Sequence, residues 1–88
     1  MYMQQSLKID EDIAATSIRE HSARPIEVLS ELLENSGLCT SQRSASAKIK
    51  KGVVRINGLR VANVGALVVL CGPTRISVDE DEILAIPR

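Results

Sequence analysis

The chain has 88 residues, a formal net charge of zero and a single aromatic residue, Tyr2. A domain of this size buries about 60–65% of the surface of its unfolded chain, and it leaves little room for a substrate pocket of about 300–1,000 Å³. We therefore expect one small domain with an aliphatic core that is not an enzyme by itself.

The first 24 residues show no regular hydrophobic period. Asp10 is placed to cap a short amphipathic helix that would use Ile13, Ala14 and Ile18, but the polar content fits a linker equally well. We assign residues 1–24 to a linker or flexible tail and residues 25–88 to the folded domain.

A first helix is expected to start at Pro25, whose fixed φ and missing N–H suit the first helical position. Gly37 is expected to end this helix in the left-handed conformation. The apolar residues that recur at helical spacing between these two positions are Ile26, Leu29, Leu32 and Leu33.

A second helix is expected from a cap at Thr40 or Ser41 to about Lys51, with Gly52 ending it. On a helical wheel its apolar side is narrow and its basic side is broad. The two positions that we expect to pack on the first helix are Ala45 and Ile49.

After Gly52 the hydrophobic pattern changes to that of strands. Asn57-Gly58 is a strong signal for a type I′ hairpin turn, because that turn needs φ > 0 at both central residues. Residues 53–56 and 59–61 flank the turn, and the remaining expected strands cover residues 67–70, 75–78 and 83–86. The predicted fold class is α+β, with two packed helices followed by a small twisted antiparallel sheet.

Charge is unevenly distributed along the chain. Residues 1–34 hold seven acidic and three basic residues, residues 35–78 hold seven basic residues and no acidic one, and residues 79–88 hold four acidic residues and one basic one. A segment this one-sided creates a positive local field on a neutral protein. A solvated helix face alone would also place cations outward, but such faces usually mix the two signs.

Six of the seven cations of the middle segment fall on the second helix and the following hairpin. They are Arg43, Lys48, Lys50 and Lys51 on the helix, and Arg55 and Arg60 on the hairpin strands. Cations arranged in this way suit a phosphate backbone, because each neutralised phosphate releases counterions. The sheet has no exposed aromatic residue on which bases could stack, so we expect recognition of backbone and shape, with structured RNA as the ligand.

Signals for membranes, metals and cofactors are missing from the sequence. There is no apolar run of about eighteen residues, so we expect no membrane partner, and residues 1–8 lack a secretion signal, which predicts a cytoplasmic location. Cys39 and Cys71 form no metal-ligand motif and are expected to be reduced thiols. His21 has no ligand at metal-site spacing, so we expect no metal and no cofactor.

Residues 41–58 resemble the alpha-L RNA-binding motif, the type named after ribosomal protein S-four, and the resemblance extends over about residues 25–86. The residues at matching positions are Ser41, Ala45, Ile49, Lys50, Gly52, Val54, Arg55, Asn57 and Gly58. It implies two helices packed against a small sheet, and binding of structured RNA through the second helix and the hairpin. The candidate RNA-binding residues are Ser41, Arg43, Lys48, Lys50, Lys51, Arg55, Asn57 and Arg60.

Within that family, Arg43, residues 61–65 and residues 73–76 look most like the C-terminal tRNA-binding domain of bacterial-type tyrosyl-tRNA synthetases. This resemblance implies tRNA as the partner and a separate parent catalytic domain for the tyrosine-tRNA ligase reaction. Residues 1–24 would then be the tether between the two.

The chain departs from the family pattern at three places. Ser46 stands where the family often has arginine, and Lys48 stands where an apolar residue is more common. Residues 79–82 are all acidic, whereas the last hairpin of the synthetase domain usually carries basic residues.

Three functions follow from these patterns. The first is the tRNA-binding appendage of a synthetase, and the second is a domain of the same type that binds ribosomal RNA or a ribosomal subunit. The third is a protein-interaction domain whose basic strip meets an acidic partner or the acidic tail of the chain itself. Salt-dependent binding of RNA would separate the first two from the third.

Overall fold

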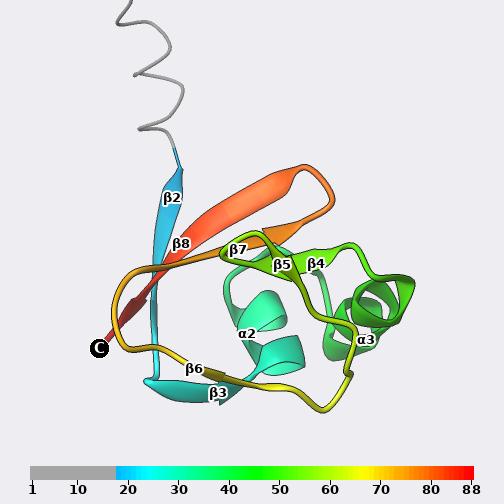
Figure 1. Cartoon of the computed structure of the whole chain (residues 1–88), viewed down its shortest axis with the longest axis horizontal. Coiled ribbons are helices and arrows are strands. Elements are labelled where there is room, and N and C mark those ends of the chain that lie inside the picture. Colours follow the sequence, from blue (N-terminus) through cyan, green and yellow to red (C-terminus); the bar gives the residue numbers. More distant parts are fainter. Residues whose placement is uncertain (1–17) are drawn as a thin grey trace, which may run out of the picture.

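The computed structural model describes residues 18–88, and within that range it has two helices and seven strands (Figure 1). In chain order these are β2 (Arg19–Ala23), β3 (Ile26–Val28), α2 (Leu29–Asn35), α3 (Gln42–Lys51), β4 (Val54–Ile56), β5 (Leu59–Arg60), β6 (Leu67–Val69), β7 (Thr74–Val78) and β8 (Asp81–Pro87). The helix considered from Asp10 onward lies outside the described residues, apart from its last position.

The predicted fold class is wrong in the order of its elements and in the type of its sheet. Strands β2 and β3 precede the helices, so the described chain does not run from two helices into a sheet. The main sheet has five strands in the order β2-β8-β7-β4-β5 and is mixed, because β2 runs parallel to β8. β3 and β6 form a separate antiparallel ribbon. The fold is α+β, but strands dominate it.

Strand β2 lies within residues 1–24, the stretch predicted to be a linker or flexible tail. It pairs with β8 from Arg19 opposite Ile83 to Ala23 opposite Pro87. The N–H of Arg88 also donates to the carbonyl of Ala23 at 2.9 Å. β2 is mostly polar because it is an edge strand, and only Ala23 is fully buried, so it lacks the apolar alternation that marks a strand.

The first helix starts at Leu29, not at Pro25 as predicted. Ile26 to Val28 pairs instead with Leu67 to Val69, and Ile26 is 58% exposed on the outer side of this ribbon. The β-branched residues Ile26 and Val28 favour a strand, whereas the leucines that follow keep the helical spacing. Gly37 has φ 85°, which confirms the predicted left-handed position after this helix.

The second helix and the hairpin agree with the prediction. The hydroxyl of Ser41 accepts a hydrogen bond from the N–H of Ser44 at 3.0 Å and caps α3. Gly52 ends α3 with φ 80°. Asn57 and Gly58 have φ 52° and 85°, as the type I′ turn between β4 and β5 requires.

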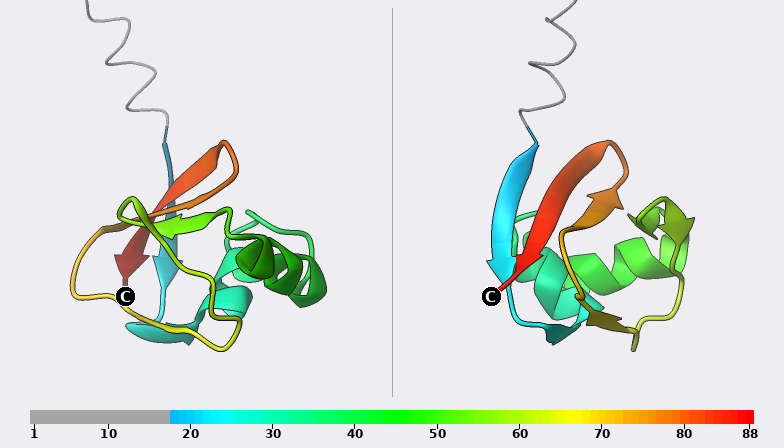
Figure 2. Two further views of the ribbon diagram at one scale, coloured as in Figure 1. Left: turned by 45° about the vertical axis from the view of Figure 1, so that its right-hand side comes forward. Right: turned by 60° about the vertical axis from the view of Figure 1, so that its left-hand side comes forward.

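The core lies between one face of the five-stranded sheet and the two helices. Figures 1 and 2 show α2 between that sheet and the β3–β6 ribbon. The predicted contact of the two helices is confirmed, because its five residues are fully buried in one cluster: Leu29, Leu32, Leu33, Ala45 and Ile49. The sheet contributes Val54, Ile76, Val78, Ile83 and Ala85. The opposite face of the sheet carries mostly polar side chains, together with Leu84 and Ile86 of β8, and is open to solvent.

Candidate nucleic-acid interface

The exposed side of α3 is basic. Ala45 and Ile49 are fully buried, so the residues on the opposite side of the helix, Arg43, Lys50 and Lys51, are exposed. None of these three cations forms an ion pair with an acidic residue in the described part of the chain. Their charge is therefore available to a ligand.

The β4–β5 hairpin extends this positive charge beyond the end of α3. Arg55 lies directly opposite Arg60 in the ladder, and both are exposed. The Arg60 side chain lies over Gly52, where an added Cβ would be 3.2 Å from its Cδ. A cation at the C-terminal end of a helix is favourable because the last carbonyls point there. We call Arg43, Lys50, Lys51, Arg55 and Arg60 the basic surface.

Lys48 is the one predicted cation that already has an acidic partner among residues 18–88. Its Nζ lies 2.5 Å from Oδ2 of Asp79 in the β7–β8 turn. This hydrogen bond raises the pKa of Lys48 above its ordinary value. The N–H of Asp79 donates to the carbonyl of Val53 at 3.1 Å, so the acidic turn is fixed beside the start of the hairpin. The acidic turn therefore borders the basic surface.

Two of the predicted site residues have visible structural roles. Ser41 caps α3 through its hydroxyl. Oδ1 of Asn57 accepts from the N–H of Arg75 at 3.0 Å, and the N–H of Asn57 donates to the carbonyl of Arg75 at 2.7 Å. Asn57 therefore links the hairpin turn to β7, and the two N–H groups of its side-chain amide remain available to donate hydrogen bonds to a ligand. Both residues hold the elements that present the cations.

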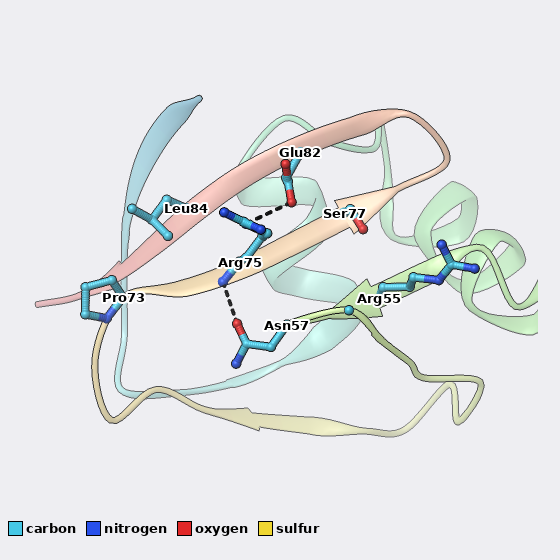
Figure 3. A pocket seen from close by; sticks show the side chains of 8 residues that line it. Arg55, Asn57, Pro73, Arg75, Ser77, Glu82 and Leu84 are labelled. Carbon is cyan, nitrogen blue, oxygen red and sulfur yellow. Dashed lines mark hydrogen bonds and ion pairs between the residues drawn. The ribbon is translucent and has the colours of Figure 1, made fainter. Parts of the chain in front are cut away.

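An open groove of about 530 Å³ lies on the solvent face of the sheet. Its lining comes from the hairpin, the loop before β7, β7 itself and β8: Arg55, Asn57, Gly58, Pro73, Arg75, Ser77, Glu82 and Leu84. Figure 3 shows Arg75 between Asn57 and Glu82, with Pro73 and Leu84 on one side and Arg55 on the other. The Nε of Arg75 lies 3.1 Å from Oε2 of Glu82.

Arg75 was not among the predicted site residues. Its strand alternates buried and outward positions, since Thr74, Ile76 and Val78 are buried and Arg75 is exposed. That alternation was visible in the sequence and could have placed Arg75 on the solvent face. Its position near Arg55 depends on the pairing of β4 with β7, which no local signal indicates.

Residues 18–88 contain few other groups that could react or bind a metal ion. Both cysteines are free thiols, with Cys39 buried and Cys71 exposed. Burial raises the pKa of the Cys39 thiol, and nearby Lys48 opposes this effect. No group of three or more metal-ligating side chains is gathered in this range. None of the described helices has the length and apolar character needed to cross a bilayer.

A scan against protein-family models finds no match, and a search of curated proteins finds none either.

Proposed function

We propose that this chain is a non-catalytic RNA-binding domain that holds structured RNA through the basic surface. The observation that carries the proposal is the presence of five exposed cations on α3 and on the hairpin that follows it, with the Arg60 side chain lying beside Gly52 at the end of α3. Two acidic residues near this surface, Asp79 and Glu82, are paired with Lys48 and Arg75. Cations without acidic partners attract a polyanion by counterion release.

Transfer RNA is the ligand that we propose, with the chain serving as the appendage of a tyrosyl-tRNA synthetase in the cytoplasm. The resemblance of residues 41–58 to the alpha-L motif supports this choice. The ligase reaction would belong to a parent catalytic domain. The hairpin strands carry no aromatic residue, so the proposed contacts are to phosphates and to the shape of the RNA.

A salt titration tests the proposal. Binding of a tRNA transcript is measured by fluorescence anisotropy at several salt concentrations. If about four to six cations contact phosphates, log K falls against log salt with a slope of about −3 to −5. A ribosomal RNA fragment of equal length is titrated in parallel, and tighter binding of that fragment would favour a ribosomal ligand. Absence of binding to either RNA at low salt would contradict the proposal.

Charge reversal locates the surface. The double variant Lys50→Glu, Lys51→Glu is expected to lose RNA binding, because both side chains project from the exposed side of α3. The matched control is Arg24→Glu, Arg88→Glu, which makes the same change in net charge. Both control residues are exposed. The N–H of Arg88 donates a hydrogen bond to the carbonyl of Ala23, which places Arg88 at the end of the sheet far from α3 (Figure 1). Equal losses in the two variants would indicate diffuse electrostatic attraction.

A further inference from the structure

We propose that the groove on the solvent face of the sheet binds one unpaired guanine nucleotide next to the RNA held by the basic surface. This inference deepens the proposed function and rests on it. The groove is continuous with the basic surface, since Arg55 belongs to both. Its volume, about 530 Å³, falls within the range of about 300–1,000 Å³ typical of small-molecule pockets.

The chemistry of the groove changes from one end to the other. Figure 3 shows the Arg55 side chain extending away from Arg75, while Ser77, which follows Arg75 on β7 and lies opposite Arg55 in the ladder, sits between them. This end offers a cation and a hydroxyl, which suit a phosphate. The other end has the apolar surfaces of Pro73 and Leu84 beside the planar guanidinium of Arg75. A flat base can lie against such surfaces, and arginine planes stack on bases.

The presence of Glu82 indicates that the groove suits a nucleotide better than a phosphate alone. A carboxylate in a groove for phosphate alone would repel the ligand. The exposed fraction of its side chain is 34%, and Arg75 holds it through Oε2 alone. Oε1 and the second lone pair of Oε2 therefore keep their capacity to accept hydrogen bonds. A base that donates hydrogen bonds therefore fits better than a second phosphate.

Guanine matches the carboxylate best among the four bases. Its Watson–Crick edge carries two adjacent donors, N1–H and the N2 amino group, which one carboxylate can accept together. Adenine and cytosine offer only an amino donor on that edge, and uracil only a ring N–H. Since paired bases use this edge in the duplex, the ligand must be an unpaired nucleotide.

The test uses the full chain and RNA stem-loops that differ by one nucleotide. One set carries an unpaired nucleotide at the 3′ end and another at the 5′ end, and each is compared with the blunt stem-loop. An unpaired guanosine in one set is expected to increase affinity about tenfold, as for one bidentate base contact. Inosine, which lacks the 2-amino group, is expected to lose most of this gain, and adenosine all of it.

Variants assign the gain to the groove. Glu82→Gln is expected to remove the preference for guanosine over inosine and adenosine, whereas the affinity for the blunt stem-loop is expected to rise slightly, because the change removes a negative charge and releases Arg75. Glu80→Gln makes the same charge change at an exposed position outside the groove lining, and it is expected to keep the preference. Thermal unfolding of both variants checks their fold, and the inosine comparison needs no variant at all.

The failures are distinguishable. Equal affinity for the blunt, guanosine and inosine forms in both sets would overturn this inference and leave the basic surface in place. A uniform loss of affinity in Glu82→Gln would show that Glu82 only holds Arg75, which also overturns it. No binding of any stem-loop at low salt would overturn the proposed function together with the inference.

Discussion

Lys48 of α3 and Asp79 of the β7–β8 turn form an ion pair across 31 positions of sequence. The pair brings the acidic turn to the border of the basic surface. A phosphate that approaches Lys48 must therefore compete with a carboxylate that is already bound there. The fold thus contains an acidic group that limits the proposed RNA footprint on this side.

Replacing Asp79 by Asn is expected to strengthen RNA binding. The change releases Lys48 and removes a negative charge, and Asn tolerates the positive φ of 54° at this position. The salt slope is expected to become steeper by about one, because one more cation contacts phosphate. Glu80→Gln is the control, since it removes a neighbouring charge without breaking this pair. Equal effects of the two variants on the slope would argue against a competing ion pair.

Removal of β2 is expected to destabilise the domain. Chains that start at residue 18 and at residue 25 differ by the strand that pairs with β8 along its length. In the shorter chain, β8 loses the backbone hydrogen bonds that it forms with β2, and the core loses the buried side chain of Ala23. Its melting temperature in thermal unfolding is expected to be lower. Identical melting temperatures would mean that β2 contributes nothing to stability.

The contact between the two helices is expected to dominate stability. Leu33→Ala and Ile49→Ala each remove a fully buried side chain, and each is expected to lower the free energy of unfolding by roughly 2–4 kcal/mol. Leu59→Ala is the control, because this leucine is 73% exposed. Urea unfolding measures all three. A loss in the control as large as in the core variants would contradict the assigned core.

The end of α3 is expected to require glycine. Gly52 has φ 80°, and an added Cβ would lie 3.2 Å from Cδ of Arg60. Gly52→Ala is therefore expected to cost roughly 1–3 kcal/mol of unfolding free energy. At Gly72 an added Cβ meets nothing within 4 Å, so Gly72→Ala is expected to be nearly neutral in the same urea titration.

The two cysteines are expected to differ in reactivity. Exposed Cys71 is expected to react with iodoacetamide at neutral pH, whereas burial protects Cys39 and raises the pKa of its thiol above the ordinary value. Mass spectrometry of the peptides measures both rates. Rapid labelling of Cys39 in the folded protein would contradict its burial.

The raised pKa of Cys39 also has a consequence for stability at alkaline pH. The folded state holds this proton more tightly than the unfolded state, so the contribution is complete below the ordinary pKa of the thiol and is lost as pH rises through the raised folded-state pKa. Unfolding free energy measured across this range is expected to fall less steeply in Cys39→Ala than in the natural sequence.

Local signals explain which elements could be predicted from the sequence. The ends of α3 and the turn of the hairpin could be predicted because they depend on local interactions. The residues that determine them are Ser41, Gly52 and Asn57-Gly58. β2 could not be found in this way, since its polar residues become a strand only because β8 offers an edge. Pro25 suggested a helix start, but pairing with β6 held Ile26 to Val28 extended.

The same distinction applies to the candidate site. The exposure of Arg43, Lys50 and Lys51 follows from the helical wheel and the apolar positions of α3. The pairing of Lys48 with Asp79 and of Arg75 with Glu82 depends on the β7–β8 hairpin and its place beside α3. Such contacts depend on tertiary structure, so composition and spacing could show the charges but not which of them are already bound.

The parallel pairing of β2 with β8 has a consequence for synthesis on the ribosome. β2 is made before the other described elements, but β8 (Asp81–Pro87), the strand with which it pairs, is made last among them. Contacts between residues so far apart in sequence are slow to form. Until β8 has been made, β2 has no partner strand and could pair with the wrong segment. The polar composition of β2 reduces that risk, because an early-emerging strand with few apolar residues has little tendency to associate with other nascent chains.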